Sequence, residues 1–132
     1  MIYLASPYSH PQEDVERDRY RLTSLATMHL ISVGINVFSP ICYSHPLVET
    51  DRQLGSSRDA SAIRQFEFWR SYDLHMLSLS SRVLVLQLPG WDTSRGVSAE
   101  MEHAAQRGIP VAMMHYAQVL ELRENDPLFS EP

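Results

Sequence analysis

Four short apolar segments along the chain alternate with stretches in which apolar residues recur at helical spacing. The apolar segments are "MIYLAS" (1–6), "INVFSP" (35–40), "RVLVLQL" (82–88) and "IPVAMM" (109–114). Short apolar runs of this kind, closed by Pro or Gly, are typical of buried strands. The spacing of the other stretches predicts helices over about 11–33, 61–79 and 98–107, and one short helix within 115–125.

Two further regions lack a sustained period. Residues 41–60 carry Pro, Gly, Ser and Asp and are predicted to form a long surface loop. The tail from about residue 124 is predicted to be poorly ordered. Gly34 and Gly108 follow the first and third long helical stretches, where they act as helix stops.

Continuous apolar strands separated by amphipathic helices predict a parallel sheet covered on both faces. With right-handed crossovers, this gives an α/β fold: one small doubly wound, Rossmann-like domain over residues 1–132, with four or five strands. Ligands of such folds bind beyond the carboxyl ends of the strands.

Composition narrows the function classes. The hydrophobic fraction of 44% and charged fraction of 20% are ordinary for a globular protein, and the net charge of −5 argues against binding a nucleic acid polymer or an acidic membrane. The single cysteine, Cys42, forms no internal disulfide. No apolar stretch approaches the length of a membrane span, and no signal-peptide pattern is present, so we expect a cytoplasmic protein.

Three polar loops follow the first three predicted strands and should meet at the carboxyl edge of the sheet. They read "SPYSH", "SPICYSH" and "PGWDTSRG". Hydroxyl, aromatic and Pro or Gly residues are frequent in all three. The substrate-contact candidates taken from these loops are Ser6, Pro7, Tyr8, His45, Asp92, Ser94 and Gly96.

Two acidic residues stand out, each with a structural and a chemical interpretation. Glu100, placed in the first turn of the predicted 98–107 helix, either favours the helix dipole or acts in catalysis. Asp73 lies within a helix, where aspartate is a poor helix former, and is either solvated or functional. Ser94 and Gly96 form a turn that either caps the helix or holds an anion. The six histidines show no paired spacing, so no metal site is expected.

The aromatic cluster "FEFW" at residues 66–69 exceeds the need of so small a core. We expect this helix to contribute core or subunit contacts rather than a base-stacking platform, and the protein to be a homodimer or higher homo-oligomer.

The chain resembles the nucleoside 2-deoxyribosyltransferase family, including its nucleotide N-glycosidase branch. The resemblance rests on "IYLASP", on the aspartate of "RSYDLHMLSLSSRVLVL", and above all on "SRGVSAEMEHAAQRGIPV". It covers about residues 1–9 and 68–112. Family members commonly carry Gly where this chain has Ser6 and Pro7, and "LPGWDT" lengthens the third loop; both departures bear on substrate identity.

The resemblance implies roles for individual residues. Glu100 would be the nucleophile that attacks the sugar of a nucleoside or nucleoside 5′-monophosphate, and Asp73 would serve the leaving base as a proton donor. Tyr3 would hydrogen-bond and orient Glu100, while Ser94 and the Gly96 amide would hold the 5′ end of the sugar. The sugar would pass to water or to another base, without metal or cofactor.

An alternative of another class stays open: the same fold would bind a nucleotide as a sensor without turning it over. A phosphatase or esterase of the doubly wound class is disfavoured because the chain has no G-x-S-x-G nucleophile elbow.

Overall fold

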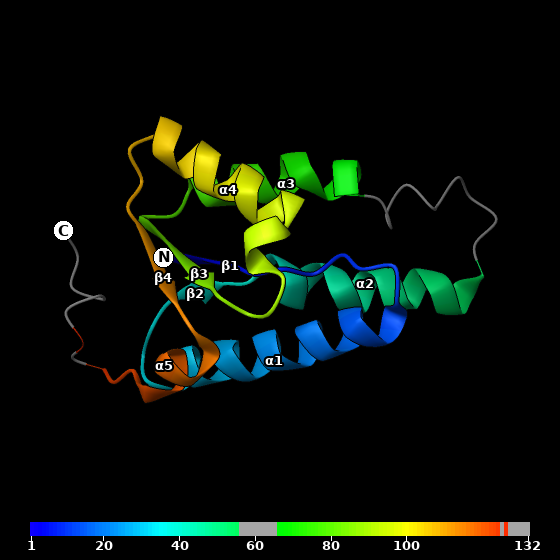
Figure 1. The fold of residues 1–132 in the computed structure, drawn as a ribbon, viewed down its shortest axis with the longest axis horizontal. Coiled ribbons are helices and arrows are strands. Elements are labelled where there is room, and N and C mark those ends of the chain that lie inside the picture. Colours follow the sequence, from blue (N-terminus) through cyan, green and yellow to red (C-terminus); the bar gives the residue numbers. More distant parts are fainter. Residues whose placement is uncertain (56–65, 125, 127–132) are drawn as a thin grey trace.

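The computed structural model describes residues 1–55, 66–124 and 126, and the strands among them form one parallel sheet (Figure 1). The strands are β1 (Ile2–Ala5), β2 (Val37–Phe38), β3 (Arg82–Leu86) and β4 (Val111–Met114), in the order β2-β1-β3-β4. Every pairing is parallel, and Tyr3 of β1 lies between Phe38 and Val83. The prediction of a parallel sheet of four or five strands is confirmed with four strands among the described residues, although β2 is shorter than the apolar run suggested.

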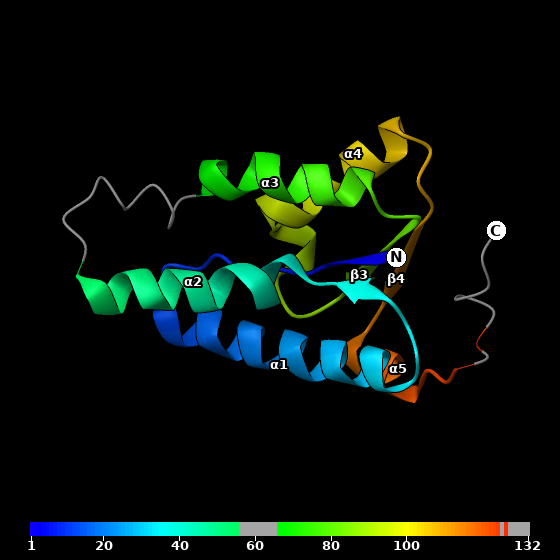
Figure 2. The ribbon, with the colours of Figure 1, turned by 180° about the vertical axis from the view of Figure 1, so that it is seen from behind.

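Helices cover both faces of this sheet, which confirms the doubly wound α/β fold (Figures 1 and 2). One face carries α1 (Glu13–Ser32) and α5 (Tyr116–Glu121), and the other carries α3 (Phe66–Ser78) and α4 (Arg95–Gln106). Helix α2 (Pro40–Leu54) packs on α1 and β1 and extends past the carboxyl ends of the strands. A short 3-10 turn, η2 (Trp91–Thr93), connects β3 to α4.

The chain reverses its direction of winding between β1 and β3. From β1 it moves outward to β2, and then returns to pair β3 against the other side of β1. At such a switch point the loops after the two strands run to opposite faces of the sheet and leave a crevice. The segments that border it are the loop after β1 and the η2 turn after β3.

Alternation along the central strands sends side chains to two different cores. Ile2 and Leu4 face α1 and α5, where the buried residues are apolar, including Ala26, Leu30 and Val119. Tyr3 and Ala5 face α3 and α4, together with Val83, Val85 and Val97.

The expectation of a loop over residues 41–60 is wrong for its described part, because residues 40–54 form α2. The Ser39 side chain caps the helix by accepting a hydrogen bond from the Cys42 N–H at 3.2 Å, and Pro40 takes the first helical position, where a missing N–H costs nothing. Pro46 lies inside the helix, and Gly55 ends it in the left-handed conformation at φ 55°. The Ser39 cap, Pro40 at the start of the helix and Gly55 at its end stabilise the helix by more than the internal Pro46 destabilises it.

One other predicted boundary differs from the structure, and three predictions fall wholly or mostly outside the described residues. Helix α4 begins at Arg95, three residues before the expected start, because Ser94 caps it by accepting from the Val97 N–H at 3.2 Å. The expected start of α3 at residue 61, the rest of the expected loop at 56–60, and most of the tail from 124 lie outside the described residues. The short helix expected near residue 115 is present as α5.

Candidate active site

Three elements bring Tyr3, Asp73 and Glu100 together at the switch point. Tyr3 points from β1 toward the face that α3 and α4 cover, where Asp73 and Glu100 lie on those two helices. The Tyr3 side chain is fully buried and Glu100 is 7% exposed. Because α4 begins at Arg95, Glu100 occupies the second helical turn, and the first turn contains no acidic residue. Favouring the helix dipole is therefore a poor explanation for Glu100, since that effect is confined to the first turn.

Burial shifts the proton affinity of this cluster. It raises the pKa of Asp73 to about 7 and that of Glu100 to about 8. The hydroxyl of Tyr3 opposes the shift at Glu100, and the charge of Asp73 adds to it. Burial, followed by the charges of Glu100 and Asp73, raises the pKa of Tyr3 well above its ordinary value. Carboxyls shifted toward neutrality are suited to proton transfer.

Several buried polar atoms in this region have no hydrogen-bond partner: Tyr3 Oη, Ser6 Oγ, Asp73 Oδ1 and Glu100 Oε2. Among the described side chains one further atom shares this condition, Thr23 Oγ1 on α1. Tyr3 approaches Glu100 closely enough to lower its pKa, but the geometry falls short of a formed hydrogen bond. Each unpaired buried polar atom costs free energy. Four such atoms in one region therefore indicate a site prepared for a ligand.

A pocket of about 310 Å³ opens directly onto this cluster. Of the sequence-predicted residues, those that line it are Ser6, Tyr8, Asp73, Ser94, Gly96 and Glu100. Its volume lies at the lower end of the range for small-molecule sites. The structure thus brings six candidates from three separate segments, the loop after β1, α3 and the start of α4, to one concave surface.

The other four candidates do not line the pocket. Tyr3 and Pro7 are fully buried, and Asp92 is exposed on η2. His45 was expected on a loop, but it lies in α2 and is 5% exposed. Its side chain contacts Tyr8 rather than the pocket.

Several lining residues were not anticipated from the sequence. Helix α2 contributes Ile41, Ser44, Val48 and Arg52, whose spacing places them on one helical face. This signal was present in the sequence but was hidden by the assignment of that segment to a loop. The remaining unanticipated residues of note are Glu16 on α1 and Trp69 on α3.

The α4 N-terminus forms the polar rim of the pocket. Ser94 Oγ already accepts the Val97 N–H, so toward a ligand its hydroxyl remains available as a donor. Gly96 lies in the first turn, where backbone N–H groups lack intrahelical acceptors. Arg95 also lines the pocket and approaches Glu67 of α3 at 3.5 Å. This rim suits an anionic or hydroxyl-bearing group.

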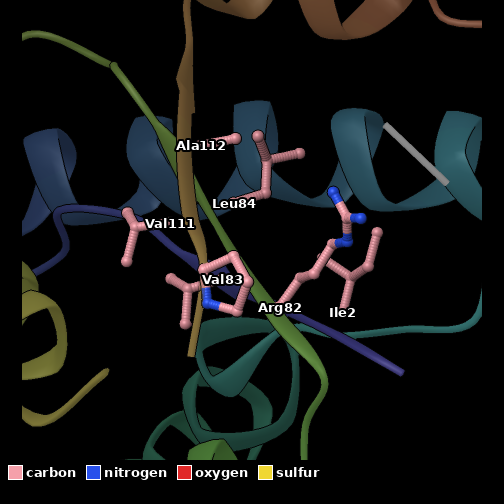
Figure 3. A pocket seen from close by; sticks show the side chains of 7 residues that line it. Ile2, Arg82, Val83, Leu84, Val111 and Ala112 are labelled. Atoms are coloured by element: carbon pink, nitrogen blue, oxygen red, sulfur yellow. The ribbon is translucent and has the colours of Figure 1, made fainter. Parts of the chain in front are cut away.

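A second cavity lies at the amino ends of the strands, among Ile2, Arg82, Val83, Leu84 and the 110–112 segment (Figure 3). Its volume is about 60 Å³, too small for a nucleoside. The pocket at the carboxyl ends is therefore the candidate active site.

Within the described part of the chain, no group of three or more His, Cys, Asp or Glu residues has the arrangement of a metal site. None of the described helices is both long and apolar enough to cross a membrane.

Comparison with models of known protein families identifies a family to which the chain is similar. The model of the family described as "Domain of unknown function (DUF1937)" matches residues 1–116, which include the whole pocket. No curated protein matches the chain.

Proposed function

Because the chain belongs to the DUF1937 family of unknown function, we propose its function from the pocket itself. We propose that the protein cleaves the N-glycosidic bond of a nucleoside or nucleoside 5′-monophosphate and passes the sugar to water or another base. The observation that supports this most is the pair of carboxyls formed by the partly buried Asp73 and the buried Glu100, whose buried oxygens Oδ1 and Oε2 lack partners at a ligand-sized pocket.

In the proposed reaction the Glu100 carboxylate attacks C1′ of the sugar on the side opposite the base. The electrons of the C1′–N bond move to the base, and Asp73 gives its proton to a base nitrogen. Water or a second base then attacks C1′, breaks the ester to Glu100 and returns a proton to Asp73. No metal or redox cofactor is needed for this sequence.

The protonation states of the two acids are the demanding feature. Burial raises the pKa of both Glu100 and Asp73, so in the empty pocket both bind protons more tightly than exposed carboxyls do. Attack requires an ionised Glu100 and a protonated Asp73. Positive charge that develops on the sugar ring favours an ionised Glu100, and the Tyr3 hydroxyl, once it donates to Glu100, favours it further. We propose that substrate binding leaves Glu100 ionised and Asp73 protonated.

The rim of α4 is proposed to hold the 5′ end of the sugar. Ser94 and Gly96 line the pocket, and Gly96 lies in the first turn of α4, which supports either a hydroxyl or a phosphate as the bound group. The ligand is thus a small-molecule nucleoside or nucleotide.

The test is turnover of a nucleotide with a good leaving group by wild type, Glu100→Gln and Asp73→Asn. Glu100→Gln should reduce cleavage by about 1,000-fold or more, because it removes the nucleophile. Asp73→Asn should slow cleavage less for bases that leave without protonation. Glu102→Gln is the matched control, since Glu102 is exposed on the same helix and does not line the pocket.

The alternative, a nucleotide sensor, predicts a different result. A sensor would bind nucleoside 5′-monophosphates and release no free base, and Glu100→Gln would leave its behaviour unchanged. Mass spectrometry of incubated nucleotides distinguishes the two. Unchanged ligand with thermal stabilisation of the protein would replace the enzyme with the sensor.

Assembly and location complete the proposal. Tyr43, Phe68 and Tyr72 are 38–50% exposed, and Tyr43 stacks on Tyr72 with centroids 5.5 Å apart. We propose that a second copy of the chain covers this aromatic surface, which sedimentation at micromolar concentration would test.

The free Cys42 fits the cytoplasmic location that we propose.

A further inference from the structure

The α1–α2 side of the pocket carries a second polar cluster that the proposed chemistry does not use. Tyr8, Glu16 and Arg52 all line the pocket there. The Arg52 guanidinium lies 2.9 Å from Glu49 and 3.8 Å from Glu16. Glu16 also accepts the backbone N–H of His10 at 3.2 Å. These contacts hold both charged groups in place along the wall.

Behind this wall lies His45, which is 5% exposed. Its ring stacks on Tyr20 with centroids 4.1 Å apart, and its Nδ1 is hydrogen-bonded to the Tyr8 hydroxyl. On the other side of the ring, Nε2 lies 3.7 Å from Glu49 Oε1. His45 therefore connects Tyr8 to the same carboxylate that pairs with Arg52.

The partners of His45 determine the direction of its hydrogen bond with Tyr8. A carboxylate faces Nε2, so the ring proton belongs on Nε2 and leaves Nδ1 as an acceptor. Burial, the largest influence, lowers the pKa of His45 and keeps the ring neutral, with Glu49 opposing and Arg52 and Arg17 assisting. Tyr8 is consequently the donor.

This direction decides what Tyr8 offers to a ligand. Its only proton is committed to His45, so toward the pocket its oxygen presents lone pairs alone. Burial, followed by the charge of Glu16, raises the pKa of Tyr8 and keeps that proton in place. With the Glu16 carboxylate, the wall presents two acceptors beside one donor, Arg52.

The part of the pocket that leads to this wall suits a flat ring. Ile41 and Val48 of α2 and Trp69 of α3 line it from two different helices. If the sugar lies at Glu100 and its 5′ group at the α4 rim, the base is the part of the ligand left to occupy this space. Aliphatic and indole surfaces are favourable for an aromatic heterocycle.

We propose that Tyr8, Glu16 and Arg52 select a base that carries an exocyclic amino group, and that His45 is the positioning residue that orients Tyr8. The amino N–H groups donate to Tyr8 and Glu16, and an adjacent ring nitrogen or carbonyl accepts from Arg52. With a keto group in place of the amino group, the keto oxygen would face the Tyr8 and Glu16 oxygens, and neither of these can donate a hydrogen bond to it. This inference rests on the proposed function, because that function places the base in this part of the pocket.

The experiment compares bases that differ at this edge: cytidine against uridine 5′-monophosphate, and adenosine against inosine 5′-monophosphate. Binding is measured by calorimetry with the Glu100→Gln protein, which cannot turn the ligand over, and cleavage is measured with wild type. We expect the amino-bearing member of at least one pair to bind about tenfold or more tightly, as one correct hydrogen bond would require.

Variants of the wall test the assignment of residues. Glu16→Gln and Tyr8→Phe should each reduce this preference several-fold. Glu13→Gln is the matched control, because it removes the same charge from α1 at an exposed position, where Glu13 pairs with Arg17. An equal loss of preference in Glu13→Gln would overturn the assignment.

His45 is tested by how it acts through Tyr8. His45→Leu removes the acceptor, frees the Tyr8 proton to face the pocket and should reduce the preference as Tyr8→Phe does. The double variant should be no worse than either single change, since both remove the same interaction. His45→Gln, whose side-chain oxygen can accept from Tyr8, should restore the preference. A loss in His45→Gln equal to that in His45→Leu would overturn the positioning role.

The binding and cleavage measurements separate this inference from the proposed function. Equal affinity within both pairs overturns the inference, whatever cleavage shows. A binding preference without cleavage by wild type supports the inference and overturns the enzyme. Failure of all four nucleotides to bind overturns both.

Discussion

The two faces of the central strands differ in the polar side chains that lie on them. On the α1–α5 face, Leu4 of β1 and Leu84 of β3 pack among other apolar residues such as Leu30. On the α3–α4 face, the same two strands contribute Tyr3 and Val85, and the helices add Asp73 and Glu100 near the carboxyl edge. One sheet therefore separates an apolar cluster from a face that contains unpaired acids, and the one unpaired buried atom that the described part of α1 carries is a neutral hydroxyl, Thr23 Oγ1.

The two faces therefore differ in how much free energy their unpaired polar atoms cost the fold. A buried carboxyl oxygen without a partner costs free energy, and the α1–α5 core avoids that cost among its buried cluster residues. The α3–α4 face bears it at the switch point, where a pocket gives the acids access to a ligand. The arrangement is expected of a site whose polar groups find their partners only in the bound state.

The largest effect on stability is predicted for the apolar face. Leu30→Ala should lower the free energy of unfolding by about 2–5 kcal/mol, because Leu30 is fully buried and its loss leaves a cavity. Turnover per folded molecule should stay unchanged. Urea denaturation and active-site titration measure the two quantities.

Leu25 provides the control for that change, since it lies on the same helix and is 39% exposed. Leu25→Ala should change stability by less than about 0.5 kcal/mol. A loss of turnover in folded Leu30→Ala protein would show that the two faces are coupled rather than separate.

A smaller and opposite effect is predicted for the acidic face. Asp73 and Glu100 bind protons more tightly in the folded chain, with pKa values of about 7 and 8, than in the unfolded chain, where such groups titrate near about 4. The stability due to these protons is complete below about pH 4 and is lost as the pH rises through 7 and 8. Asp73→Asn and Glu100→Gln should therefore stabilise the protein at pH 8.5 by about 1–3 kcal/mol.

The dependence on pH identifies the cause of that gain. At pH 4 both acids are protonated in the folded chain, so the amides should give little or no stabilisation. The partly exposed Asp73 should show the smaller effect. The exposed Glu102→Gln should show no such pH-dependent gain. Stabilisation of equal size at both pH values would mean that charge burial is not the cause.

The fold was predictable because its signals are local. Runs such as "RVLVLQL" mark parallel strands, and the order of strands and helices implies a doubly wound sheet. The same reasoning placed Ser6, Tyr8 and Ser94 at one edge, because parallel strands carry their following loops to the same side. All three line the pocket in the structure.

The α2 wall was not predictable by the same reasoning. Pro46 within residues 41–60 indicated a break, whereas the helix forms through its Ser39 cap and tolerates the proline. Without that helix, the common face of Ile41, Val48 and Arg52 could not be recognised. The buried position of His45 depends on packing against Tyr20 of α1, a tertiary contact that no local pattern specifies.

The smallest predicted effect concerns the Tyr3 hydroxyl, which points from β1 toward the acids on the α3–α4 face. Tyr3→Phe should change stability by less than about 1 kcal/mol, because the Oη atom it removes has no formed hydrogen bond to lose. The hydroxyl lowers the pKa of Glu100, so its removal should raise that pKa and move the rising limb of the pH–rate profile for cleavage to higher pH. The matched control is Tyr116→Phe, which removes a hydroxyl beside the α1–α5 core and should leave the limb in place. An unchanged limb in Tyr3→Phe would remove Tyr3 from the proposed orientation of Glu100, while leaving Glu100 itself as the nucleophile.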